Sequence, residues 1–177
     1  MDFEKQTLGD LHRFLASIGK MDKVMAETAD IQDLWPGVLE AYLPDGVREF
    51  EKYPVVSLGW IMFVGMAMAK YWDTDWEKYA KEGGAAIYTR LRDAKGYDNM
   101  DEYILKEVLG LDEKQEEEAS KIVGECASRT LSALHRANIE AGTEAAANAY
   151  IGGLRALYTA GAAMELNALG YHMQAMG

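Results

Sequence analysis

The C-terminal stretch of the chain, residues 141–177, reads AGTEAAANAYIGGLRALYTAGAAMELNALGYHMQAMG. Of the 47 Asp, Glu, Lys and Arg side chains in the protein, it holds only Glu144, Arg155 and Glu165. A helix with so few charges is not expected to face solvent on one side. We therefore expect other helices of the same chain, a second subunit or lipid to cover it.

The length of this segment narrows those three alternatives. A helix over residues 143–176 would be about 51 Å long, whereas a domain of this size is only about 40 Å across. We therefore predict either a break at Gly152-Gly153 or an end that packs on another subunit. Arg155 and Glu165 in its interior argue against a membrane span. The segment thus predicts a buried helix and self-association through it as a homodimer.

The most hydrophobic stretch, residues 55–69, reads VVSLGWIMFVGMAMA. Fifteen helical residues span about 22 Å, less than the roughly 30 Å hydrocarbon core of a membrane. Because apolar residues occupy every side, we predict a central core helix surrounded by neighbours; membrane association through this segment is the alternative.

Helical spacing and capping signals cover most of the remaining chain. Apolar residues three and four apart predict helices over residues 3–27 and 84–95. A helix is expected to begin at Trp35-Pro36 and to break at Pro44-Asp45-Gly46. Asn99 and Asp112 begin two predicted capping boxes. No strand pattern is present, so we expect one all-α domain over residues 1–177, a bundle of about six to eight helices with a long C-terminal helical hairpin.

The charge distribution excludes several classes of partner. The net charge is −11 and no segment is basic, so a cationic surface for nucleic acid or anionic lipid is not expected. Cys126 is the single cysteine, which excludes an intrachain disulfide. The N-terminal residues lack the basic and apolar regions of a signal peptide. These features predict a soluble cytoplasmic protein with no nucleic-acid or membrane partner.

Aromatic and acidic side chains alternate directly after the most hydrophobic segment. Trp72 and Trp76, four residues apart, would share one face of a continuous helix, beside Asp73 and Asp75. Aromatic faces next to carboxylates suit an organic cation, so this is the predicted site for a small ligand. The structural alternative is that the tryptophans close the end of the hydrophobic helix while the aspartates cap the next one.

Arg155 is the second candidate for ligand contact. A desolvated arginine requires an anionic partner, and Glu165 is too far along the same helix to supply it. The partner is therefore expected to be a carboxylate of another helix, a residue of a second subunit, or a bound anion.

Catalytic and metal-binding motifs are missing from the sequence. Glu-x-x-His, which di-iron bundles use, precedes none of the three histidines, and no phosphate loop or nucleophile elbow occurs. A weaker alternative is a metal site between the last two helices, formed by His135, Glu140, Glu165 and His172. We therefore expect no cofactor and a non-catalytic protein that binds a partner or a small ligand; the alternative is a metal- or cofactor-dependent enzyme.

Overall fold

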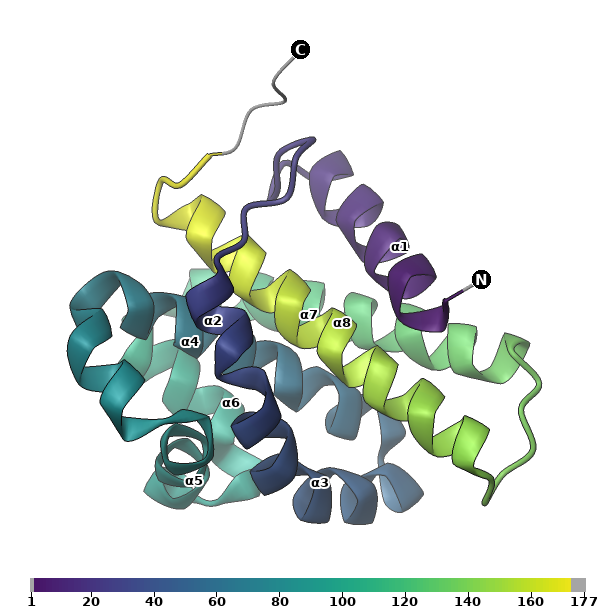
Figure 1. Ribbon diagram of the computed structural model, residues 1–177. Helices are drawn as coiled ribbons and strands as arrows, with labels where there is room; N and C mark the ends of the chain where they lie inside the picture. Colours follow the sequence, from purple (N-terminus) through teal and green to yellow (C-terminus); the bar gives the residue numbers. More distant parts are fainter. Residues whose placement is uncertain (1, 173–177) are drawn as a thin grey trace.

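The charge-poor C-terminal segment forms α8 (Glu144–Ala168) in the computed structural model, which describes residues 2–172. Thr143 caps this helix, because its Oγ1 accepts a hydrogen bond of 3.1 Å from the Ala146 backbone N–H. Figure 1 shows α8 crossing the molecule beside α1 (Phe3–Ser17). Its most extensive packing is with α4 (Pro54–Glu82), followed by α1.

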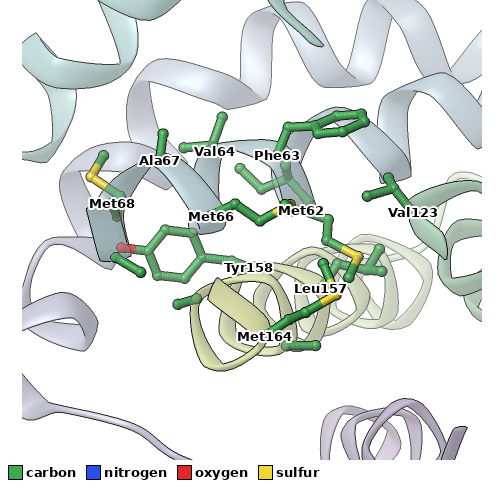
Figure 2. Close-up of a cluster of buried hydrophobic side chains, with 14 of the residues drawn as sticks. Met62, Phe63, Val64, Met66, Ala67, Met68, Val123, Leu157, Tyr158 and Met164 are labelled. Atoms are coloured by element: carbon green, nitrogen blue, oxygen red, sulfur yellow. The ribbon is translucent and has the colours of Figure 1, made fainter. Parts of the chain in front are cut away.

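Two glycines bring α4 and α8 into backbone contact. A Cβ atom on Gly65 of α4 would lie under 3.0 Å from the carbonyl oxygen of Tyr158 on α8. A Cβ atom on Gly161 of α8 would lie equally close to the carbonyl oxygen of Met62 on α4. Figure 2 shows the side chains around this crossing, including Met62 and Met66 of α4 and Tyr158 and Met164 of α8. Glycine at both positions therefore sets the distance between the two central helices.

The predicted break of the last helix at Gly152-Gly153 is wrong. α8 is continuous through both residues, because their missing side chains make room for neighbouring helices. A Cβ on Gly152 would be 3.3 Å from Glu4 of α1, and one on Gly153 would be 3.0 Å from Thr130 of α7. The helix ends at Ala168, so it is about 37 Å long and fits within the bundle. Residues 173–177, part of the longer helix that the sequence predicted, lie outside the described residues.

α4 is the central helix, as predicted, but it is longer than the expected stretch 55–69 and continues to Glu82 with a non-helical residue at Asp75. It is the one helix of the described residues that is long and apolar enough to cross a membrane, but 72% of its most apolar 18-residue window is buried. Burial on all sides by neighbouring helices accounts for its apolar composition.

The other elements surround α4 and α8 and share one hydrophobic core with them. In chain order they are α2 (Ala29–Asp33), α3 (Trp35–Lys52), α5 (Gly84–Lys95), the 3₁₀ turn η1 (Tyr97–Asn99), α6 (Met100–Tyr103), the π-helical turn η2 (Ile104–Val108) and α7 (Glu113–Arg136). Residues 2–172 contain eight α-helices and no strand, which confirms the all-α bundle. The segment between α7 and α8 forms the bend of the C-terminal hairpin (Figure 1).

Two predicted boundaries differ from the structure. The first helix ends at Ser17 rather than near residue 27, and Gly19 beyond it adopts a φ of 74° that ordinary residues avoid. α3 continues through Pro44-Asp45-Gly46 to Lys52. Gly46 is required within it because a Cβ there would collide with the Tyr42 ring and the Tyr150 hydroxyl.

Candidate functional site

The aromatic and acidic residues at the end of α4 have partners within the chain. The indole Nε1 of Trp72 donates a 3.0 Å hydrogen bond to Asp30 Oδ2 of α2, and its ring packs edge-on against Tyr171 at a centroid distance of 5.1 Å. The Tyr171 hydroxyl donates a 2.6 Å hydrogen bond to Asp73 Oδ1. Trp72 and Asp73 therefore connect α4 with α2 and with the segment that follows α8.

A kink separates the two tryptophans. Asp75 is non-helical, with φ −162° and ψ 79°, and its Oδ1 accepts a 3.4 Å hydrogen bond from the backbone N–H of Lys78. Because the helix direction changes at Asp75, Trp72 and Trp76 do not share the face of one continuous helix. Neither of them lines the cavities described below, and cation binding at this segment stays a prediction.

Arg155 lies on the solvent side of α8. Its side chain is 44% exposed, and its Nε is 4.0 Å from Glu4 Oε2 of α1. The partner thus comes from another helix of the same chain, but the expected desolvation of the guanidinium is wrong. Arg155 also lines a cavity of about 410 Å³ between α1, α2 and α8, together with Glu27 and Thr159.

The four residues of the alternative metal site lie near opposite ends of α8. His135 is in the last turn of α7 and Glu140 is in the loop that precedes α8. Glu165 is near the far end of α8, about 30 Å from its start, and His172 follows the helix. The Nδ1 atom of His172 is 2.8 Å from Asp22 Oδ2. In residues 2–172 no three His, Cys, Asp or Glu side chains come together as a set that could hold a metal ion.

Glu165 instead lines a cavity of about 300 Å³ at one end of the bundle. The cavity is bounded by α4, the first half of α7, the end of α8 and the loop after α1. Its apolar wall is formed by Met66, Leu111, Ala119, Ile122, Met164 and Ala168. Met66 and Met164, labelled in Figure 2, continue directly into the hydrophobic core. Five polar residues complete the lining, namely Lys20, Gln115, Glu118, Glu165 and Asn167, and a mixture of apolar walls and polar groups is typical of small-molecule sites.

The carboxyl group of Glu165 is the chemically unusual member of this cavity. Burial raises its pKa to about 7; Lys70 partly opposes this shift and Asp73 adds to it. No hydrogen bond or ion pair to this carboxyl is present among the described residues. Partial burial beside apolar side chains reduces the hydration of this carboxylate, so the cavity favours a ligand that supplies either a positive charge or a hydrogen bond.

The charged residues that line the cavity carry a small excess of negative charge, because Lys20 stands against Glu118 and Glu165. Lys20, in the loop after α1, forms an ion pair with Glu118 of α7 at this edge. The adjoining turns of α7 carry Glu113, Glu116 and Glu117 outside the cavity lining, together with Lys114 and with Lys121, which pairs with Glu117. Clustered negative charge raises the local concentration of cations near such an opening. The arrangement therefore favours a cationic ligand over an anionic one.

Sequence reasoning singled out Glu165 but not the cavity around it. The signal was an isolated carboxylate inside a charge-poor helix, which we assigned to a metal site. Its apolar neighbours come from α4, α7 and α8, and no local pattern marks Leu111 or Ile122 as their companions.

Comparisons with family models, with curated proteins and with solved structures found no match to this chain.

We expect Glu165→Gln to stabilise the protein more at pH 8 than at pH 4.5. The folded state holds the Glu165 proton more tightly than the unfolded state, because its pKa rises from 4.5 to about 7 on folding. That stability is fully present below pH 4.5 and is lost as the pH rises through 7. If the whole pKa shift contributed to the free energy of unfolding, the contribution would be at most about 3 kcal/mol. Solvent screening reduces the expected gain at pH 8 to about 1–2 kcal/mol.

Urea unfolding of wild type and variant at the two pH values measures this difference. Glu144→Gln provides the control, since Glu144 is an exposed carboxylate at the other end of the same helix. An identical pH response of the two variants would contradict the assignment of a raised pKa to Glu165.

Proposed function

We propose that this protein is a non-catalytic helical bundle that binds a small ligand, an apolar molecule with a protonated amine, in the Glu165 cavity. The observation that carries the proposal is the half-buried carboxyl group of Glu165, which lies beside apolar side chains of the cavity and has no hydrogen-bond or ion-pair partner among residues 2–172. An ammonium group of the ligand would pair with this carboxylate, and the apolar part of the ligand would contact Met66, Ile122 and Met164. This replaces a poorly solvated charge by an ion pair, so the ligand and the cavity stabilise each other.

The size of the cavity limits the ligand. A volume of about 300 Å³ is at the lower end of the range for small-molecule sites. It accommodates a single ring or a short alkyl chain with one amine. Lys20 and Glu118, which form an ion pair, are part of the lining of this cavity.

Benzylamine and its neutral analogue benzyl alcohol test the proposal directly by calorimetric titration at constant ionic strength. The ionised fraction of a carboxyl with a pKa near 7 rises from about 3% at pH 5.5 to about 90% at pH 8, so amine affinity should increase roughly 30-fold. The alcohol should show no comparable increase, because it carries no charge to pair with the carboxylate.

Glu165→Gln should remove both the pH dependence and the preference for the amine, while Glu144→Gln should retain them. The proposal fails if amine and alcohol bind equally at pH 8, or if Glu165→Gln binds the amine as tightly as the wild-type protein does. Absence of binding by either probe at millimolar concentration also argues against this cavity as a ligand site.

Self-association through α8 also stays a proposal, although the argument from burial no longer supports it. The helix is covered by α1, α4 and α7 of its own chain, so burial of the charge-poor segment does not require a second subunit. A cytoplasmic location and the lack of nucleic-acid and membrane partners are likewise proposed from the acidic composition. The light-scattering mass of the purified protein distinguishes monomer from dimer.

A further inference from the structure

A third cavity, of about 340 Å³, lies between α1 and α7 on a different part of the surface. One face of α1 contributes Phe3, Gln6, Thr7, Asp10 and Arg13, and one face of α7 contributes Arg129, Ala133, Arg136 and Ala137. Arg129 and Arg136 are seven residues apart, so they project from the same side of the helix. The short side chains of Ala133 and Ala137 leave the space between them open. We call this cavity the arginine cleft.

Ion pairing distinguishes the arginines of this cleft from the others in the chain. Among the described residues, five of the seven arginines lie within 4.0 Å of a carboxylate oxygen, namely Arg48, Arg90, Arg92, Arg129 and Arg155. The two that lack such a partner there, Arg13 and Arg136, both line the arginine cleft. In a protein with a net charge of −11, carboxylates are abundant, so two arginines without one mark a local excess of positive charge.

Arg129 is held in place at the centre of the cleft. Its Nε donates a 3.0 Å hydrogen bond to Glu125, one Nη1 hydrogen is directed to Asp10 at 3.4 Å, and its guanidinium lies 4.5 Å from the centre of the Phe14 ring. A guanidinium has five N–H donors, so three remain available. Counting Arg13, Arg129 and Arg136 against Asp10 and Glu125 gives a net charge of +1.

The cleft also contains an unused hydrogen-bonding group. Thr7 is 5% exposed, and its hydroxyl oxygen is buried without a hydrogen-bond partner in the described part of the chain. Buried hydroxyl groups almost always have a partner. Thr7 lies on the α1 wall of the cleft, but protein atoms cover its hydroxyl oxygen, so we do not count it among the groups that contact a ligand.

We propose that the arginine cleft binds a phosphate group, either as free phosphate or as the phosphate of a small phosphomonoester. Planar guanidinium groups bind phosphate oxygens through paired N–H donors, and three of them converge here from two helices. Arg129 supplies a fixed guanidinium, while Arg13 and Arg136 are exposed and free to close on the ligand from the two sides. Phe3, Ala133 and Ala137 provide an apolar surface for an organic part of the ligand.

Inorganic phosphate and phenyl phosphate are the probes, titrated against the full-length protein by calorimetry and by ³¹P NMR at constant ionic strength. We expect saturable binding of both that weakens as NaCl increases. Tighter binding of phenyl phosphate would indicate a phosphomonoester, and equal affinity would indicate free phosphate. Acetate should bind more weakly than either, because it offers fewer oxygens to the three arginines. Acetate binding as tight as phosphate binding would contradict the assignment.

The double variant Arg13→Gln/Arg136→Gln should lower phosphate affinity about tenfold or more. Both residues are exposed and form no ion pair in the described structure, so the fold should be retained. Ala133→Leu leaves the three arginines in place but fills the space between them, and it should also reduce binding. Lys95→Gln, an exposed cation on α5, should have no effect.

Unchanged phosphate affinity in the double variant, or in Ala133→Leu, would overturn the proposal, as would a lack of saturable binding by the wild-type protein. This site is independent of the Glu165 cavity, which shares no residue with it. Glu165→Gln should therefore bind phosphate normally, and the arginine double variant should bind benzylamine normally.

Discussion

Gly161→Ala is expected to lower the free energy of unfolding by about 3 kcal/mol. The new methyl group would lie under 3.0 Å from the backbone carbonyl oxygen of Met62. A side chain could rotate away from such a contact, but a carbonyl inside a helix cannot, so α4 and α8 must move apart. Gly65→Ala should have a similar effect, since the corresponding contact is with the carbonyl of Tyr158. Equilibrium unfolding in urea measures both values.

Gly124→Ala is the matched control for this prediction. Gly124 lies within α7, and a Cβ atom there would meet nothing within 4 Å. The substitution should therefore stabilise the protein by about 0.5–1 kcal/mol through helix propensity alone. If Gly161→Ala and Gly65→Ala are also neutral or stabilising, the close crossing of α4 and α8 is incorrect.

Asp45→Ala is expected to destabilise the protein by about 3–4 kcal/mol. Asp45 is only 7% exposed and accepts hydrogen bonds from the Tyr88 hydroxyl at 2.8 Å, from Arg92 Nη1 at 3.1 Å and from Arg48 Nη2 at 3.0 Å. Its removal leaves the fully buried Tyr88 hydroxyl without this partner and deprives Arg92 of its buried carboxylate. The two hydrogen bonds that α5 donates to this carboxylate of α3 would be lost together. Thermal and urea unfolding give the magnitude.

Asp93→Ala tests whether burial accounts for this effect. Asp93 pairs with the same Arg92, at 2.9 Å from its Nε, but the side chain of Asp93 is 61% exposed. Exposed ion pairs contribute about 0–1 kcal/mol, so this variant should remain close to wild type. Equal losses in the two variants would show that the Asp45 network does not have the expected stabilising role.

Local signals predicted several helix starts correctly. Asp112 and Gln115 form the predicted capping box at the start of α7, with hydrogen bonds of 2.8 and 3.0 Å in the two directions. Thr143 caps α8. The second predicted box is wrong, because the Asn99 side chain donates to the carbonyl of Lys95 instead. Capping involves residues three positions apart, so sequence reveals the candidates, but a neighbouring carbonyl can compete for the same side chain.

Helix interiors were predicted less well where glycine and proline occur. α3 passes through Pro44 and Gly46, and α8 passes through Gly152 and Gly153. The glycines would weaken isolated helices by about 1 kcal/mol each, but here they allow a neighbouring helix or ring to approach closely. This packing energy comes from residues remote in sequence, so the local pattern gives the wrong answer.

The Glu165 cavity also combines a feature that is visible in the sequence with features that depend on the tertiary structure. The sequence shows that Glu165 is an isolated carboxylate within a charge-poor segment, and it predicts that this segment is helical. Its pKa near 7, however, depends on burial produced by several elements at once. The arginine cleft depends even more on the tertiary structure. Arg13 and Arg129 are 116 residues apart in the chain and come to line one cavity only when α1 packs on α7.

The amino-acid sequence therefore specified an all-helical chain whose two least polar segments, now α4 and α8, lie in its interior. Helix formation and burial depend on composition and spacing within a few turns, and these are local properties. The crossing of α4 and α8 at Gly65 and Gly161, the continuity of α8 and both cavities arise only from packing. They depend on which helix faces meet, and that choice is made by shape and volume summed over the whole core.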